Sequence, residues 1–245
     1  MAETRRAAET RRAYGEGCIA AHALDLVGDR WALLVIRELM LGPKRFGAIR
    51  AGVPGVASNI LTRRLEELEA AGIVARRALP APASAPAYDL TPHGAALRRT
   101  LLALCRWGAG MPGHDHTLPI SPTALVLSME SMIRPQPGRF TAGFDLGGEI
   151  FSLTACSGRL RIRRSDAPDG EMVFAGAPND MAVVIYGPAP LARSAADGRV
   201  SFTGDPARGQ GFVDLFRLER PPTDAPTDAP TNAAPDPARI EGEPA

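Results

Sequence analysis

Between residues 56 and 71, side chains that can hydrogen-bond with the edges of DNA bases recur at helical spacing. Asn59, Thr62 and Arg63 fall on one arc of a helix, with Ser58 and Glu66 at the edges of that arc. An arginine can pair with guanine through two hydrogen bonds, an asparagine can pair with adenine, and a threonine can contact a thymine methyl group. These residue types at this spacing predict a helix that reads bases in the major groove.

Basic residues lie on both sides of this segment in the sequence. They are expected to contact phosphates, which would position the protein on DNA without reading its sequence: Lys44, Arg45, Arg76 and Arg77. Arg64 lies closer to the apolar side of the predicted helix, so we expect it to reach a phosphate rather than a base. The alternative, that these charges only solvate a surface, stays open.

The residues that could form a catalytic or metal centre do not occur in suitable patterns. Cys18, Cys105 and Cys156 are too few and too widely spaced for a disulfide framework, and no CxxC pair or His/Cys cluster predicts a zinc site. The sequence has no nucleophile elbow, HExxH motif or phosphate-binding glycine loop. We therefore expect no enzymatic activity, no cofactor and no bound metal.

The elements expected around the base-reading segment follow a recognisable order. Apolar spacing predicts a helix over residues 18–40, a short helix over 45–50 and a helix over 56–71, whose Leu61, Leu65 and Leu68 face a core. Strand-like segments at 73–79 and 87–90 predict a hairpin, and Thr91 with Pro92 begins a last helix. This is the order of a winged helix-turn-helix domain, which holds one helix out toward the groove.

Several segments of this stretch resemble the HxlR family of bacterial regulators. They occur in order, with matching gaps, at 18–19 (CI), 24–31 (LDLVGDRW), 36–39 (IREL), 42–46 (GPKRF), 60–69 (ILTRRLEELE), 72–74 (GIV), 88–94 (YDLTPHG) and 107–108 (WG). The resemblance implies a MarR-like fold that binds double-stranded operator DNA as a homodimer. Because terminal helices pair the subunits in this family, it also implies that the apolar stripe of the last helix does so here: Leu97, Leu101, Leu104 and Trp107. Packing of this stripe within the monomer or on the next domain is the alternative.

Cys18 fits the family pattern, whereas the residue that follows it and the wing tip depart from it. Cys18 aligns with a cysteine that some family members use to sense oxidants or electrophiles, and a structural or silent cysteine is the alternative. Ile19 replaces the proline that follows this cysteine in many members. The wing tip at residues 80–86 (PAPASAP) has no basic residue, so strand residues Arg76 and Arg77 are expected to supply phosphate contacts near the wing.

Residues 120–219 predict a second, α+β domain. A helix is expected over 123–132, followed by strands at 139–145, 149–155, 159–163, 171–175, 181–186 and 199–203, and by a helix over 211–218. The segments 140–148, 197–206 and 212–216 resemble, more faintly, the sterol-carrier-protein-like fold. That resemblance implies an apolar cleft for a small hydrophobic ligand. The alternative is that these glycines form turns and these phenylalanines form a core.

Composition and charge indicate how the chain is divided into domains and connecting segments. Residues 1–116 carry a net charge of +5 and residues 117–245 a net charge of −4, so the first part suits a polyanionic partner better. We expect an N-terminal arm or helix extension at 1–17, a DNA-binding domain at 18–110, a linker at 111–119, a ligand-binding domain at 120–219 and a disordered tail at 220–245. No signal peptide or membrane-spanning run is evident, which favours the cytoplasm and no membrane partner.

Three functions remain in competition at this point. The first is a dimeric regulator controlled by an apolar effector in the second domain. The second is a regulator controlled by oxidation of Cys18, with the second domain serving as a dimerisation or partner module. The third is a lipid-carrier or acyl-transfer protein. The residues of 56–71 that could read bases argue against this third function.

Overall fold

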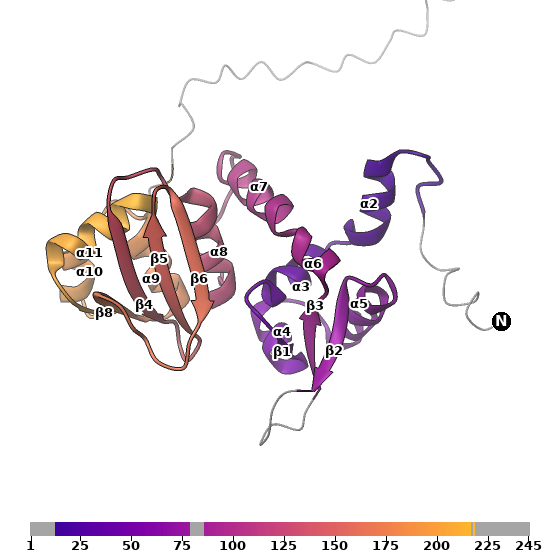
Figure 1. Ribbon diagram of the computed structural model, residues 1–245, viewed down its shortest axis with the longest axis horizontal. Coiled ribbons are helices and arrows are strands. Elements are labelled where there is room, and N and C mark those ends of the chain that lie inside the picture. Colours follow the sequence, from indigo (N-terminus) through magenta and orange to yellow (C-terminus); the bar gives the residue numbers. More distant parts are fainter. Residues whose placement is uncertain (1–12, 79–85, 217, 219–245) are drawn as a thin grey trace, which may run out of the picture.

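The computed structural model describes residues 13–78, 86–216 and 218, and it contains two separate hydrophobic cores (Figure 1). Of the segments named in the sequence analysis, residues 1–12 of the arm expected at 1–17, residues 80–85 of the wing tip expected at 80–86, and the tail expected at 220–245 lie outside the described residues. Residues 13–17 precede the first helix without regular secondary structure. No helix in the described ranges is long and apolar enough to cross a membrane.

The first core is built from helices and a small three-stranded sheet. Its elements are α2 (Ile19–Val27), α3 (Ala32–Leu39), β1 (Lys44–Arg45), α4 (Phe46–Gly52), α5 (Ser58–Ala70), β2 (Val74–Ala78), β3 (Pro86–Leu90), α6 (Pro92–Ala96) and α7 (Arg98–Ala109). The strands pair antiparallel in the order β1-β3-β2. Leu61, Leu65 and Leu68 of α5 are buried against α3, as the apolar spacing predicted. The order of elements is that of a winged helix-turn-helix.

The helix expected over residues 18–40 is broken into α2 and α3 at residues 28–31. A β-carbon on Gly28 would lie 2.5 Å from the carbonyl oxygen of Leu24, so only glycine fits at this position. Asp29 Oδ1 then accepts a hydrogen bond from the backbone amide of Trp31 at 2.9 Å. An aspartate bonded to the amide two residues later forms a local turn, which separates the two helices.

The ends of α5 and α6 follow the local signals in the sequence. Gly72 has a φ of +69°, and the amide of Ile73 donates to the carbonyl of Leu68 at 2.9 Å, which closes the last turn of α5. The hydroxyl of Thr91 accepts from the amide of Gly94 at 3.2 Å and caps α6. The helix expected after Pro92 is divided at Leu97 into α6 and α7.

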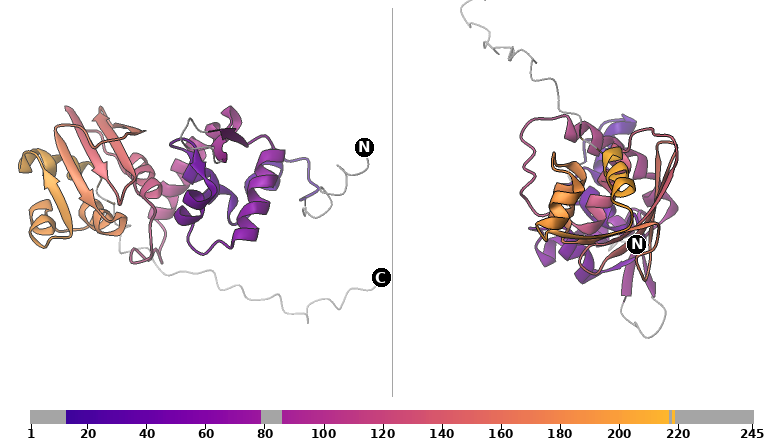
Figure 2. Two further views of the ribbon diagram at one scale, coloured as in Figure 1. Left: turned by 90° about the horizontal axis from the view of Figure 1, so that it is seen from below. Right: turned by 90° about the vertical axis from the view of Figure 1, so that its left-hand side faces the viewer.

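The second core lies between a five-stranded sheet and helices on one of its faces (Figures 1 and 2). Its elements are α8 (Pro122–Met132), β4 (Arg139–Asp145), β5 (Ile150–Cys156), β6 (Arg159–Arg164), β7 (Met172–Gly176), α9 (Pro178–Tyr186), α10 (Leu191–Ala196), β8 (Val200–Thr203), α11 (Pro206–Val213) and η1 (Asp214–Phe216). The strand order is β6-β5-β4-β7-β8, and β4 and β7 are the parallel pair. The chain is therefore of the α+β class.

The strand expected over residues 181–186 is wrong, because this segment forms the end of α9. This segment is rich in β-branched and aromatic residues, which favour strands. It lacks the alternation of polar and apolar residues that would distinguish a strand from a buried helix. Pro178 begins the helix, and Met181, Val184 and Ile185 are its buried positions, at helical spacing. The helix expected over 211–218 ends earlier, with α11 stopping at Val213 and a single 3₁₀ turn following.

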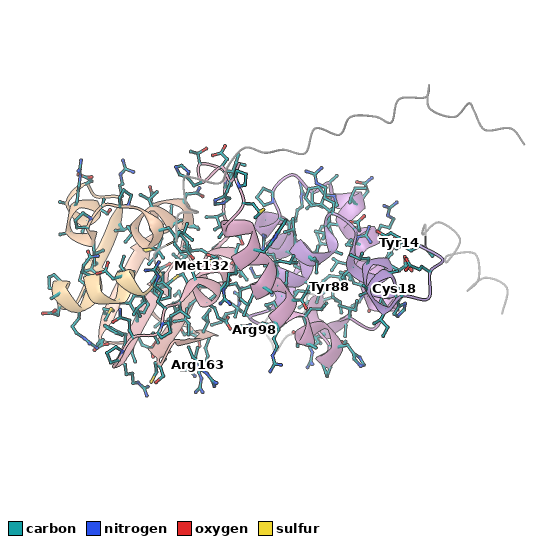
Figure 3. All side chains as sticks on the ribbon, turned by 90° about the horizontal axis from the view of Figure 1, so that it is seen from above. Tyr14, Cys18, Tyr88, Arg98, Met132 and Arg163 are labelled. Carbon is teal, nitrogen blue, oxygen red and sulfur yellow. The ribbon has the colours of Figure 1, made fainter. Side chains whose placement is uncertain are left out.

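The two cores are joined through α8, which packs against α7 and α3. Arg98 of α7 donates to Glu130 of α8 at 3.1 Å and to the carbonyl of Met40 at 3.2 Å (Figure 3). Arg106 donates to the carbonyl of Ser131 at 2.8 Å. Charged hydrogen bonds therefore fix the second core against the helices of the first.

Candidate DNA-binding surface

The polar arc of α5 is exposed, opposite its buried leucines. Ser58, Asn59, Thr62 and Arg63 all face solvent. The hydroxyl of Thr62 donates to the carbonyl of Ser58 at 3.0 Å, so this hydroxyl is already partly satisfied by its own helix. The structure thus brings these four predicted residues together on one open helix surface, at its N-terminal half.

Arg63 is held only loosely in the free protein. Its side chain is 62% exposed, and its Nε lies 3.6 Å from Glu67 Oε1 one turn later. An exposed pair at this spacing contributes about 0.3–0.5 kcal/mol, which is small beside a pair of hydrogen bonds to a base. The guanidinium of Arg63 is therefore free to exchange its carboxylate partner for a base edge.

Three of the predicted phosphate contacts are exposed around this helix. Arg45 faces solvent in β1. Arg76 lies 3.1 Å from Glu69 and Arg77 lies 2.8 Å from Asp89, both with more than half of their side chains exposed. Surface pairs of this kind are readily replaced by phosphate oxygens, so the three arginines can serve as contacts to a DNA backbone.

Lys44 is buried, and the prediction that it contacts a DNA phosphate is wrong. Its side chain is 2% exposed, and its ammonium nitrogen lies 2.8 Å from Glu38 and 3.1 Å from Glu149. It also donates to the hydroxyl of Thr123 at 3.0 Å. Glu38 is itself fully buried and also accepts from Ser121 Oγ at 2.6 Å. Lys44 therefore joins the two cores instead of facing DNA.

Arg64 is also buried, so the prediction of a phosphate contact is wrong for this residue too. Its guanidinium lies 2.6 Å from Asp29 and pairs with Glu67 on its own helix. Asp29 stands in the turn between α2 and α3, which means that Arg64 fixes the orientation of α5 against that turn. Sequence reasoning missed this pair because Asp29 and Arg64 are far apart in the chain and neither lies in an apolar stripe.

The structure divides the four residues predicted to pair subunits. Leu97 and Leu101 pack against the first core, which is the alternative left open for this stripe. Leu104 is 43% exposed and Trp107 is 65% exposed. Two apolar residues of α2 that the sequence analysis did not assign to subunit contact are exposed as well, Leu24 by 49% and Ile19 by 86%. Exposed apolar side chains on α2 and α7 are candidates for burial by a second subunit.

The cysteines occupy different environments. Cys18 is exposed at the start of α2, and the backbone amides of Ala21 and Ala20 lower the pKa of its thiol. Burial raises the pKa of the Cys105 thiol, although the charge of Arg37 opposes that shift. All three cysteines are free thiols, and the part of the chain that the structure describes holds no group of His, Cys, Asp and Glu suited to a metal.

Phenylalanines fill the space between the sheet and helices of the second core. Phe144 and Phe174 stack at 4.8 Å between ring centroids, and Phe212 lies 5.1 Å from Phe216. A surface cavity of about 240 Å³ lies elsewhere, beside the loop after α9. Its walls are Ile185, the segment 187–190, Gln210, Val213 and Asp214. This volume is below the range of about 300–1,000 Å³ that is usual for ligand pockets.

Comparison with known proteins places the first core in a family. The sequence profile described as HxlR-like helix-turn-helix matches residues 26–115. An HTH-type transcriptional regulator of Synechocystis sp. is 35% identical over 95 residues, which are 39% of this chain and 70% of that protein. The HTH-type transcriptional regulator YodB of Bacillus subtilis is 40% identical over 85 residues, 35% of this chain and 76% of that protein.

A solved structure of a similar regulator also matches part of the chain. The reduced form of YodB is 36% identical and covers 40% of this chain and 100% of its own, with a TM-score of 0.36. The family profile ends at residue 115, before α8 and the second core. From its matched residues and the two similar regulators, this chain belongs to the HxlR-type helix-turn-helix transcriptional regulators.

Proposed function

We propose that this regulator binds a double-stranded operator as a homodimer and reads bases with the exposed arc of α5. The observation that carries the proposal is the division of α5 into a buried leucine stripe and an open arc of Ser58, Asn59, Thr62 and Arg63. These side chains are the donors, acceptors and methyl group that discriminate base pairs in the major groove. Arg45, Arg76 and Arg77 hold the phosphates on either side.

The homodimer rests on the exposed apolar residues of the terminal helices. Leu104 and Trp107 of α7, with Ile19 and Leu24 of α2, expose large side chains that a second copy would cover. Two copies related by a twofold axis would place two α5 helices in successive major grooves, so the operator should be palindromic. The two cores correspond, in this proposal, to a DNA-binding domain at 18–110 and a second domain at 120–219.

Binding of the purified protein to the DNA upstream of its own gene tests the proposal. The affinity should exceed that for random DNA of the same length, and it should fall steeply between two salt concentrations because counterions are released. Equal affinity for both DNAs, under reducing conditions and without added ligand, would count against operator recognition by this form of the protein.

Control by the thiol of Cys18 is a second candidate function. The observation that favours it is an exposed thiol whose pKa is lowered by the first amides of α2, the helix that also carries the exposed Ile19 and Leu24. Oxidation or alkylation at this position would alter the subunit contact. An electrophile that weakens operator binding of the wild type but not of Cys18→Ser supports this control, and equal weakening of both excludes it.

An apolar effector in the second domain is the other form of control. The sterol-carrier-like resemblance suggests such a ligand, and the cavity between the loop after α9 and α11 is a place for it. Its walls include the apolar Ile185, Pro188 and Val213. Ala189→Trp should fill this cavity, so a hydrophobic ligand that alters DNA binding of the wild type should have no effect on that variant. An unchanged ligand response would remove the cavity from consideration.

A further inference from the structure

Strand β6 presents three arginines on the face of the sheet that the helices leave uncovered. Arg159, Arg161 and Arg163 alternate along the strand and are exposed, whereas Leu160 and Ile162 between them are buried in the second core. Arg163 extends outward from the sheet (Figure 3). β6 is an edge strand, so this row stands at the border of the sheet, on the side of α8.

The row carries uncompensated positive charge. Within the described residues, no carboxylate lies within ion-pair distance of Arg159, Arg161 or Arg163, whereas the next residue, Arg164, binds Glu149 at 2.6 Å. Two of the acids in the following segment have other partners: Asp169 accepts from the hydroxyl of Ser152, and Glu171 binds Arg208 at 2.7 Å. Asp166 in the same segment is exposed and, among the described residues, forms no ion pair with the row. Arg139 of β4 stands in the same cross-strand row as Arg159, through Cys156.

The row continues toward the DNA-binding surface of the first core. Arg164, at the end of β6, shares Glu149 with Lys44 of β1, whose neighbour is the exposed Arg45. The contacts that fix the second core therefore bring the end of β6 next to β1. Figure 1 shows β6 on the side of the sheet that faces the first core. The exposed Arg45 and the row on β6 thus belong to two strands, one in each core, that are linked through Lys44, Glu149 and Arg164.

We propose that Arg159, Arg161 and Arg163 bind the phosphate backbone of DNA that flanks the operator. This inference rests on the proposed function. Alternate side chains of a strand are about 7 Å apart. The phosphates of one DNA strand advance about 3.4 Å each along the helix axis while they wind around it, so arginines at this spacing can reach several phosphates of a backbone that passes along the row. Guanidinium groups suit phosphate oxygens because they donate in a planar fork. The second core then extends the contact with DNA beyond the stretch that α5 reads.

Charge-matched double variants of the full-length protein test this role. Arg161→Gln with Arg163→Gln removes two members of the row, and Arg193→Gln with Arg199→Gln removes the same charge near β8 at the opposite edge of the sheet. On a long operator duplex, the first variant should bind about tenfold more weakly at 0.1 M salt. Its slope of log affinity against log salt should be smaller by about 3.6, since each of the two subunits loses two phosphate contacts. The second variant should match the wild type.

Duplex length separates this inference from the proposed function. On a duplex cut back to the palindrome alone, the wild type and the Arg161→Gln, Arg163→Gln variant should bind equally well. An unchanged slope on the long duplex would overturn the inference. So would an equal loss of affinity in both double variants, or tighter binding of the first variant. In those cases, a loss of operator preference in Arg63→Ala would still leave the proposed function standing.

Discussion

Arg63 and Arg64 are adjacent in α5, and the turn of the helix places them in opposite environments. Arg63 is mostly exposed with a distant carboxylate, whereas Arg64 is 5% exposed and bound to Asp29 and Glu67. A single step of about 100° around the helix thus separates a side chain available to DNA from one that holds the helix in place.

Alanine substitutions of this pair should have different consequences. Arg64→Ala leaves Asp29 without its partner and should lower the free energy of unfolding by about 1–3 kcal/mol, since the two carboxylates are only partly buried. Arg63→Ala, the matched control, should change it by less than about 0.5 kcal/mol. Urea denaturation followed by circular dichroism measures both. Equal destabilisation would mean that Arg64 does not anchor α5.

Cys18 and Cys105 should differ in the pH at which their thiols react. Alkylation requires the thiolate, so a lowered pKa shifts the rise in rate to lower pH and a raised pKa shifts it to higher pH. The alkylation rate of Cys18 should therefore rise at lower pH than that of Cys105. Peptide mass spectrometry after timed exposure to iodoacetamide at a series of pH values measures this, and the reverse order would contradict the account of both sites.

At the scale of the element, α2 and α7 combine a face packed on the first core with apolar residues that stay exposed. Trp107→Glu places a charge where a second subunit should pack, so the dimer should dissociate at concentrations at least about 100-fold higher than for the wild type. Val183→Glu is the control, because Val183 is also exposed but lies on α9 of the second core. Sedimentation equilibrium distinguishes the two. Dissociation caused equally by Val183→Glu would place the interface elsewhere.

The elements that the sequence predicted well are those with strong local signals. The buried stripe and exposed arc of α5, the glycine that ends it and the threonine that caps α6 are all determined by neighbouring residues. The end of α9 was predicted as a strand because its apolar run lacks alternation, and only packing between the sheet and other helices decides its form. The division of 18–40 depends on the Asp29 turn, which apolar spacing does not reveal.

The predicted DNA contacts were wrong for residues that have a partner distant in the sequence. The charge of Lys44 suggested an anionic partner, and its partners are Glu38, six residues earlier, and Glu149, 105 residues later. Pairing over such a distance depends on how the two cores dock. The next residue, Arg45, is exposed, as the sequence suggested. The sequence therefore indicated which residues could bind DNA, and the tertiary structure selected among them.

For the whole molecule, the ionic contacts of Lys44 should couple the stability of the two cores. Lys44→Met removes the ammonium partner of the fully buried Glu38, which keeps Arg37 at 2.9 Å and the hydroxyl of Ser121. It should therefore lower the free energy of unfolding by about 1–3 kcal/mol. Hydrogen exchange should accelerate in both α3 and α8, because both contribute to the same cluster. Arg45→Met, an exposed neighbour, is the control and should change neither. Faster exchange confined to α3 would mean that the cores are not coupled through Lys44.

The most direct test of the central claim is the ability of α5 to discriminate bases. The affinities of the wild type, Arg63→Ala and Arg76→Ala are measured for the operator and for an operator with one base pair changed in each half-site. Arg63→Ala should lose about 1–3 kcal/mol of discrimination, whereas Arg76→Ala should weaken binding to both DNAs alike. If Arg63→Ala instead weakened both DNAs equally and kept the wild-type discrimination, base reading by this arc of α5 would be contradicted.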